Sequence, residues 1–160
     1  IAGNAATFSV QATSTGPLKY QWYRNSSAIS GATAATYRVT TSLALNNSWY
    51  YCRVSNSAWL DVSAYALLTV RALTDMIPKI YSQPVSRTII SGQVGTLSVG
   101  AYNNGPFTYQ WKANGITIPN ATSSSYSIYG HPSINGLKYS VTIRNSYGAT
   151  TSLPATITIR

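Results

Sequence analysis

Hydrophobic and polar residues alternate over short stretches of the chain, and turn-forming residues separate these stretches. Every second residue is apolar in residues 7–12, 18–23, 36–39 and 50–54, and residues 64–70 form a last stretch of strand-forming residues. Successive side chains of a strand point to opposite faces, so each stretch predicts a strand that is half-buried. Short strands with a turn about every eight to twelve residues are typical of an all-β sandwich.

The pattern occurs twice. Gly16-Pro17 and Tyr20-Gln21-Trp22 recur 89 positions later as Gly105-Pro106 and Tyr109-Gln110-Trp111, and the match continues without a gap to Arg160. A repeat of this length is a whole small domain rather than a solenoid unit. The sequence therefore predicts two tandem domains, residues 1–71 and 78–160, joined by a short linker, residues 72–77.

The two copies differ at their start. Residues 78–86 precede Gly92 in copy two, whereas only two residues precede the equivalent Gly3 in copy one. We therefore expect the first domain to lack its opening strand. Two explanations stay open: the sequence is a fragment of a longer protein, which we favour, or a partner chain supplies the strand by β-strand addition.

Charge narrows the choice of partners. The chain holds 11 Lys and Arg against 2 Asp and Glu, a net charge of +9 at pH 7. This excess favours anionic partners such as acidic glycans or the acidic face of another protein subunit. The basic residues are dispersed, which argues against nucleic-acid binding. No apolar run approaches the length of a membrane-spanning helix, so we expect no membrane insertion.

Residues that could perform chemistry are few and scattered. The two carboxylates, Asp61 and Asp75, are far apart in sequence, the one histidine is His131, and the one cysteine is Cys52. Catalysis requires convergent acids, bases or nucleophiles, and a metal site requires clustered ligands. The sequence therefore predicts a protein with no catalytic residues, no metal site and no cofactor, and it makes an intramolecular disulfide impossible.

At this point the sequence resembles the immunoglobulin-like family in its bacterial and phage form. The resemblance rests on Trp22, on Tyr50-x-Cys52 some 30 residues later, on residues 29–33 and on the turn Asn56-Ser57. It covers nearly the whole chain. It implies two immunoglobulin-like sandwiches whose structural core contains Trp22, Tyr50, Cys52, Trp111 and Tyr139.

Two details follow from the resemblance. The family's inter-sheet disulfide would join positions 10 and 52, but Val10 faces Cys52 here, and the second copy has two valines at these positions. Packing around the tryptophans must replace the bridge. Tyr50 and Tyr139 resemble the family's tyrosine corner, in which the hydroxyl bonds to the backbone.

Aromatic and basic residues alternate with the core positions in the first copy. Because successive side chains of a strand point to opposite faces, these aromatic and basic residues are predicted to point outward on one sheet. Trp59 is predicted to lie at the tip of a loop. The candidate binding residues are Tyr23, Arg24, Trp49, Tyr51, Arg53, Trp59 and Tyr65. The same positions in copy two are mostly polar or basic.

Three interpretations of these aromatic residues stay open. They dock another protein subunit, they stack against sugars, or they pack against the missing strand, the linker or the second domain. The sequence favours a non-enzymatic structural or adhesive surface module, most readily a phage virion decoration or tail-associated protein that attaches weakly to a host surface. The alternative is a stalk or a carbohydrate-binding accessory domain of a bacterial cell-surface or secreted protein. The expected location is the virion surface or, in the alternative, the extracellular space or bacterial cell surface.

Overall fold

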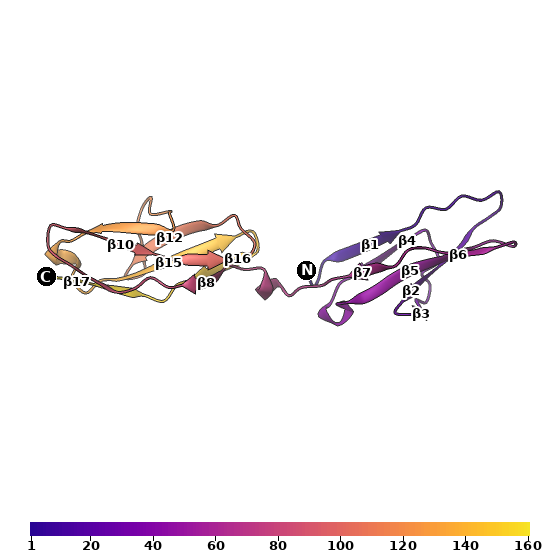
Figure 1. Ribbon diagram of the computed structural model, residues 1–160, viewed down its shortest axis with the longest axis horizontal. Helices are drawn as coiled ribbons and strands as arrows, with labels where there is room; N and C mark the ends of the chain where they lie inside the picture. The colour runs from indigo at the N-terminus through magenta and orange to yellow at the C-terminus, as the bar shows by residue number, and fades with distance from the viewer. The chain divides into compact units, whose positions relative to one another are not determined.

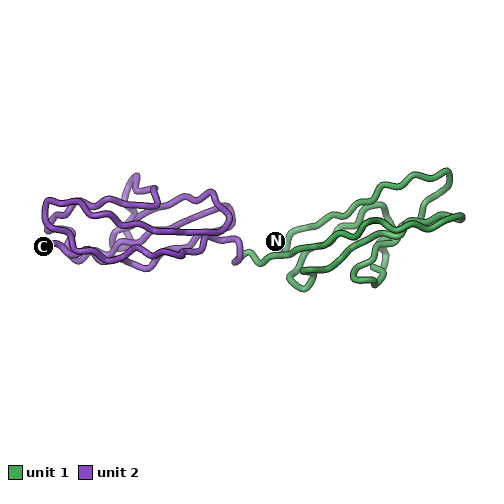
Figure 2. Tube along the Cα trace, in the orientation of Figure 1, with its two compact units in different colours: residues 1–73 green, residues 74–160 purple.

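The computed structural model describes residues 1–160 and divides them into two compact units (Figures 1 and 2). Unit 1 comprises residues 1–73 and unit 2 comprises residues 74–160. The boundary falls inside the segment 72–77 that we expected to be a linker. Asn103 and Asn145 donate hydrogen bonds to carbonyl oxygens of Ile77 and Met76, so the last part of this segment is attached to unit 2.

Unit 1 contains seven strands and one short 3-10 helix. They are β1 (Ala5–Ser9), β2 (Lys19–Arg24), β3 (Ser27–Ala28), β4 (Thr36–Thr40), η1 (Leu43–Leu45), β5 (Ser48–Ser55), β6 (Leu60–Val62) and β7 (Ala66–Leu68). β1 pairs with β4 in a two-stranded sheet. The second sheet has the order β3-β2-β5-β6, and β7 also pairs with β5. We expected a turn at residues 56–60 and one strand over 64–70, but the structure forms two short strands, β6 and β7, in this region.

Unit 2 repeats this arrangement and adds strands at its start. Its elements are β8 (Lys79–Ser82), β9 (Arg87–Ile89), β10 (Val94–Ser98), β11 (Gly100–Tyr102), β12 (Thr108–Ala113), β13 (Ile116–Thr117), β14 (Ser125–Tyr129), η3 (Pro132–Ile134), β15 (Lys138–Asn145), β16 (Gly148–Thr151) and β17 (Ala155–Ile159). The short 3-10 helix η2 (Leu73–Asp75) lies at the boundary between the units.

The added strands of unit 2 belong to two different sheets. β8 runs antiparallel to β11, and β9 runs parallel to β17 at the edge of the sheet β13-β12-β15-β17-β9. Unit 1 has no strand equivalent to β8 or β9. The expectation that its opening strand is missing is confirmed, and so is the all-β fold class.

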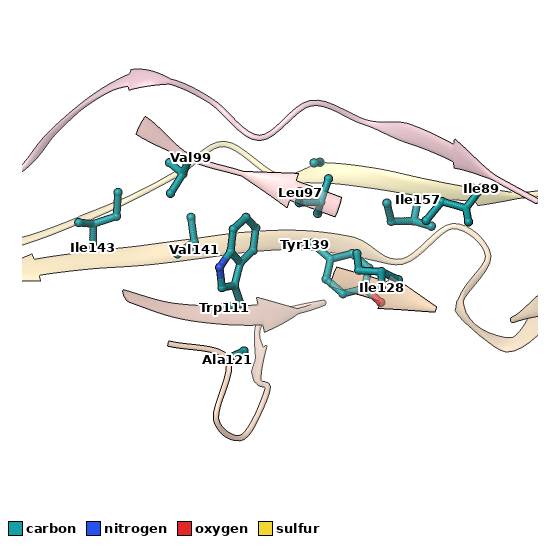
Figure 3. Close-up of a cluster of buried hydrophobic side chains, with 11 residues drawn as sticks. Ile89, Leu97, Val99, Trp111, Ala121, Ile128, Tyr139, Val141, Ile143 and Ile157 are labelled. Carbon is teal, nitrogen blue, oxygen red and sulfur yellow. The ribbon is translucent and has the colours of Figure 1, made fainter. Parts of the chain in front are cut away.

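Each unit encloses one central tryptophan. Trp22 and Trp111 are both buried, and each indole N–H donates to a backbone carbonyl at 2.9 Å, of Ala34 and Ser123 respectively. Figure 3 shows Trp111 surrounded by the aliphatic side chains of unit 2. A buried tryptophan commonly needs such a partner for its N–H group. The tryptophan therefore holds the centre of each sandwich in place of a disulfide.

The glutamine of the repeated Tyr-Gln-Trp stretch has a structural function. The side-chain amide of Gln21 donates to the carbonyl oxygens of Trp22 and Ile29, and Gln110 does the same to Trp111 and Ile118. Each glutamine thereby ties its strand to the turn that follows it. This bond explains why the repeat keeps glutamine next to the core tryptophan.

Candidate functional site: an aromatic face on unit 1

The pairing of β2 with β5 places a row of large side chains on the outer face of unit 1. Tyr23 lies opposite Tyr51, and Trp49 lies opposite Leu67 of β7. Alternate residues of a strand share a face, so Arg53 joins Tyr51 and Trp49. We call the set Tyr23, Trp49, Tyr51, Arg53 and Tyr65 the aromatic face.

The members of the aromatic face contact one another closely. The rings of Tyr23 and Tyr51 stack 5.0 Å apart at an angle of 7°, and Tyr65 lies 4.6 Å from Tyr51 at 48°. The guanidinium of Arg53 lies 4.7 Å from the centre of the Tyr23 ring, in cation–π geometry. These neighbours leave Tyr51 only 5% exposed although it lies on the outer face. Such contacts hold the rings in fixed positions.

A hollow lies beside the stacked rings. It has a volume of about 570 Å³ and is lined by Asn25, Ser26, Trp49, Tyr51 and Tyr65. Trp49 and Tyr65 remain 47% and 60% exposed, so their ring surfaces are available to a ligand. The hollow therefore offers aromatic walls together with polar groups from the turn.

Asn25 fixes the polar side of this hollow. Its backbone has φ of 46°, a left-handed conformation that asparagine tolerates better than most residues. Its Oδ1 atom accepts a hydrogen bond of 2.8 Å from the backbone N–H of Trp49. The turn after β2 is thus attached to the start of β5, next to the indole. We did not predict Asn25 and Ser26 as site residues, because no sequence pattern marked this turn as close to Trp49.

Two predicted site residues lie away from the aromatic face. Arg24 pairs with Tyr50, which places it on the inward-facing side of β2 at the end of the strand. Trp59 lines a separate hollow that also includes Val10 and Val54. The structure therefore brings together Tyr23, Trp49, Tyr51, Arg53 and Tyr65 and separates them from the other two.

The resemblance to a tyrosine corner is wrong in one respect. Tyr50 is buried at the predicted position, but its hydroxyl has no hydrogen-bond partner. Burial raises the pKa of Tyr50, and the nearby Arg24 side chain opposes that rise. Arg24 nevertheless forms no hydrogen bond of normal geometry with the Tyr50 hydroxyl. The ring instead stacks on Phe8 at a centroid distance of 4.4 Å. Burial also raises the pKa of the equivalent Tyr139.

The ionisable residues that we considered for catalysis do not converge. The Asp61 carboxylate accepts the N–H of the next residue, Val62. His131 caps the 3-10 helix η3, and its Nδ1 atom is paired with the hydroxyl and backbone N–H of Ser133. No group of three potential metal ligands occurs in the structure. The structure contains no helix with the length and apolar character needed to cross a membrane.

The fold defines the chain as a tandem of two immunoglobulin-like β-sandwiches, the first without its opening strand. An I-band fragment of titin is similar over 98% of this chain and 60% of its own length, with 19% sequence identity and a TM-score of 0.54. A chimeric titin Z1Z2 tandem is similar over 99% of this chain and 92% of its own, with 17% identity and a TM-score of 0.50. The sequence matches no protein-family model and no curated protein. At this identity the similarity establishes the fold alone.

Proposed function

We propose that the chain is a non-enzymatic structural and adhesive surface module, and that the aromatic face of unit 1 is its adhesive surface. The observation that carries this proposal is the exposed, mutually stacked cluster around Tyr51 with its adjoining hollow. Tryptophan, tyrosine and arginine are the residues that most often dominate binding energy at protein interfaces. Tandem immunoglobulin-like domains with this fold suit a structural or adhesive role.

The arrangement of unit 2 supports a free aromatic face rather than one that packs under the missing strand. In unit 2, Ile80 and Ile89 of the opening segment pack in the buried core cluster with Leu97, Val99 and Ala155, which are the equivalents of Phe8, Val10 and Ala66. The aromatic face is on the outer side of β2 and β5. An opening strand on unit 1 would therefore leave this face uncovered.

The setting that we propose is the virion of a tailed phage, with the module as a capsid decoration or tail-associated protein that attaches weakly to a host surface. The resemblance to bacterial and phage immunoglobulin-like domains supports it. So does the construction of both sandwiches without a disulfide, since Cys52 is a buried free thiol. Such sandwiches can assemble in a reducing cytoplasm.

A specific feature favours a second candidate, carbohydrate binding by an accessory domain of a bacterial surface or secreted protein. The hollow joins the flat rings of Trp49, Tyr51 and Tyr65 to the polar side chains of Asn25 and Ser26. Aromatic rings can stack on the apolar face of a sugar while polar groups bond to its hydroxyls. Neutral or anionic glycans are thus the ligands expected in this case.

Adhesion of the purified chain to intact bacterial cells tests the proposal. We expect Trp49→Ala and Tyr65→Ala each to reduce cell-bound protein at least about tenfold, because each removes an exposed hot-spot ring. Tyr129→Ala, at an exposed tyrosine of unit 2, is the matched control and should leave adhesion unchanged. Protease treatment of the cells should abolish binding to a protein receptor, and periodate treatment should abolish binding to a glycan. Equal adhesion by wild type and both unit 1 variants would contradict the proposal.

A further inference from the structure

The outer face of unit 2 is basic where the outer face of unit 1 is aromatic. β12 and β15, which lie side by side and pair antiparallel, form this part of the sheet (Figure 1). Lys112 and Lys138 occupy the positions of Tyr23 and Trp49 in unit 1, and Arg144 lies near the end of β15. We call Lys112, Lys138 and Arg144 the basic face of unit 2.

Alternation along the strands turns the basic face away from the core. Trp111 precedes Lys112 and is 0% exposed, and Ile143 has the same burial directly before Arg144. The two cations therefore point to the other side of the sheet. Arg144 is exposed and Lys112 is half-buried. The opening segment of unit 2, residues 78–89, pairs with β11 and β17 and leaves the basic face open.

A hollow of about 170 Å³ lies on the basic face. The residues that line it are Thr108, Tyr109, Gln110, Lys112, Thr142 and Arg144. Lys112 lies opposite Ser140, four residues before Arg144 on β15, so the backbones of the two cations are about 13 Å apart along the strand. The hollow is smaller than the pockets that hold drug-sized ligands, and it has room for a group such as one sugar residue.

The cations of the basic face have no acidic neighbour in their own sandwich. Residues 76–160 contain six Lys and Arg and no Asp or Glu. Carboxylates of a mixed surface normally offset the potential of nearby cations, and none is available on β12 or β15. The positive potential at the hollow is therefore left for an anionic ligand to neutralise.

The hollow also contains hydrogen-bonding groups that are held in place. The Nε2 atom of Gln110 donates to the carbonyl oxygens of Trp111 and Ile118 at 3.1 and 2.8 Å, which fixes the amide and leaves its Oε1 atom as an acceptor. The hydroxyls of Thr142 and Thr151 lie 3.0 Å apart and share one hydrogen bond. A sulfate ion offers no O–H group to such acceptors, whereas the hydroxyls of a sugar both donate and accept. The hollow therefore suits a ligand that carries hydroxyl groups as well as negative charge.

Side chains alone hold the anionic group on this face. The backbone N–H groups of β12 and β15 lie in the plane of the sheet and pair across the ladder between residues 108–113 and 139–144. They do not point at a ligand as the N–H groups of a phosphate-binding helix terminus do. The planar guanidinium fork of Arg144 matches the two oxygens of a carboxylate. A carboxylate is therefore the anionic group that fits the hollow best.

Nucleic acid fits the basic face less well. Proteins that bind single strands offer exposed aromatic rings on which successive bases stack. The aromatic residue of the hollow, Tyr109, is half-buried, and its ring contacts Phe107 edge-on at a centroid distance of 6.5 Å. Binding to a duplex depends on many phosphate contacts, and the basic face supplies three cations.

We propose that the hollow of the basic face binds an acidic polysaccharide whose sugars carry carboxylates. Arg144 binds the carboxylate of one sugar, and Lys112 neutralises that of a sugar further along the polymer. Gln110 and Thr142 bond to the hydroxyls of the sugar between these two cations. The site belongs to unit 2 and does not depend on the adhesive role of the aromatic face.

The test uses the full chain, titrated at low ionic strength with an oligogalacturonate, a linear oligomer of galacturonic acid, and followed by the amide NMR spectrum. We expect saturable shifts at residues 108–112 and 140–144. Arg144→Gln and Lys112→Gln should each weaken binding at least about fivefold, because each removes a charged contact with a carboxylate. Added salt should weaken binding to the wild type as well.

Two charge-matched variants separate a site from general attraction to a basic protein. Lys79→Gln lies on β8, in a different sheet, and Arg87→Gln lies on the edge strand β9. Each lowers the net charge by one, as the variants in the hollow do, and each should change the affinity by less than about twofold. Equal weakening by all four variants would overturn the site.

Two other ligands and one variant of unit 1 complete the test. An uncharged dextran of equal length should not bind, and binding as tight as that of the oligogalacturonate would overturn selection by charge. A single-stranded oligonucleotide with the same number of charges should bind more weakly, and tighter binding would overturn the choice of polysaccharide. Trp49→Ala should leave oligogalacturonate binding intact, so this proposal and the adhesive proposal can fail separately. Loss of binding in Trp49→Ala with full binding in Arg144→Gln would place the ligand on the aromatic face instead.

Discussion

The two units have the same fold but place their apolar side chains differently. Unit 2 buries eleven residues in one cluster, whereas the cluster of unit 1 contains four, with more partly buried neighbours than fully buried members. Unit 1 instead carries aromatic rings on its outer face, where unit 2 has Lys112, Lys138 and Ser140. The outer face of unit 1 therefore exposes apolar surface at positions where unit 2 is polar or basic.

Removal of the central tryptophan should show the largest difference between the units. Trp111→Ala should reduce the free energy of unfolding of unit 2 by about 3–5 kcal/mol, because it leaves a cavity inside a closed core. Trp22→Ala should cost less in unit 1, since Trp22 lines a hollow together with Phe8 and Tyr50. Urea denaturation followed by NMR signals of each unit measures both losses. Equal losses would show that the two cores are equally enclosed.

Truncation of the strand that closes unit 2 should make that unit resemble unit 1. Ile89 is buried between the equivalents of Ala6 and Thr41, so Ile89→Ala should destabilise unit 2 by about 2–5 kcal/mol. The labelling rate of Cys52 should not change, because this thiol lies in unit 1. Amide hydrogen exchange of β10 and β17 provides the measurement. An unaltered exchange rate would mean that β9 contributes little to closure.

The stacked tyrosines should show a smaller coupling. A double-mutant cycle with Tyr23→Ala and Tyr51→Ala should give a coupling energy of about 0.5–1.5 kcal/mol, as stacked aromatic pairs do. The equivalent cycle with Lys112→Ala and Ser140→Ala in unit 2 should give almost none. Thermal and urea unfolding of the four variants of each cycle supply the values. A coupling near zero for both pairs would indicate that the stack is not a stable feature of the face.

Exchange of the buried cysteine for valine should have the smallest effect. Cys52 occupies the position of Val141, so Cys52→Val should change stability by less than about 1.5 kcal/mol at neutral pH. Burial raises the pKa of the Cys52 thiol above its value of about 8.5 in the unfolded chain. The thiol therefore makes its full contribution to stability at pH values below that unfolded pKa. This contribution is lost as the pH rises above that value. Cys52→Val should remove that part of the alkaline destabilisation in pH-dependent urea melts, while a Cys52→Ser control should cost about 1–3 kcal/mol.

The sequence was sufficient to predict the fold because its signals were local and repeated. Alternation located β2, β4 and β5 to within two residues, and the displacement of 89 positions related the two sandwiches. β6 was missed because Leu60–Val62 is only three residues long and lies soon after the turn at Asn56. The strand character of β6 depends on its pairing with β5, which no single strand encodes.

The candidate site was only partly predictable. The alternation of side chains along a strand identified Trp49, Tyr51 and Arg53 as outward-facing. The same alternation places Arg24 on the inner side, and in the structure Arg24 pairs with Tyr50. Asn25 was missed since its bond to Trp49 spans 24 positions. The errors in predicting the site have one cause, because contacts between loops and distant strands depend on tertiary geometry rather than on the local sequence pattern.

The parallel pairing of β9 with β17 has a mechanical consequence. When unit 2 is pulled from its two ends, these strands are drawn in opposite directions, so the hydrogen bonds between Arg87–Ile89 and Ile157–Ile159 are loaded together in shear. Tension on unit 2 should therefore be resisted until these bonds break together.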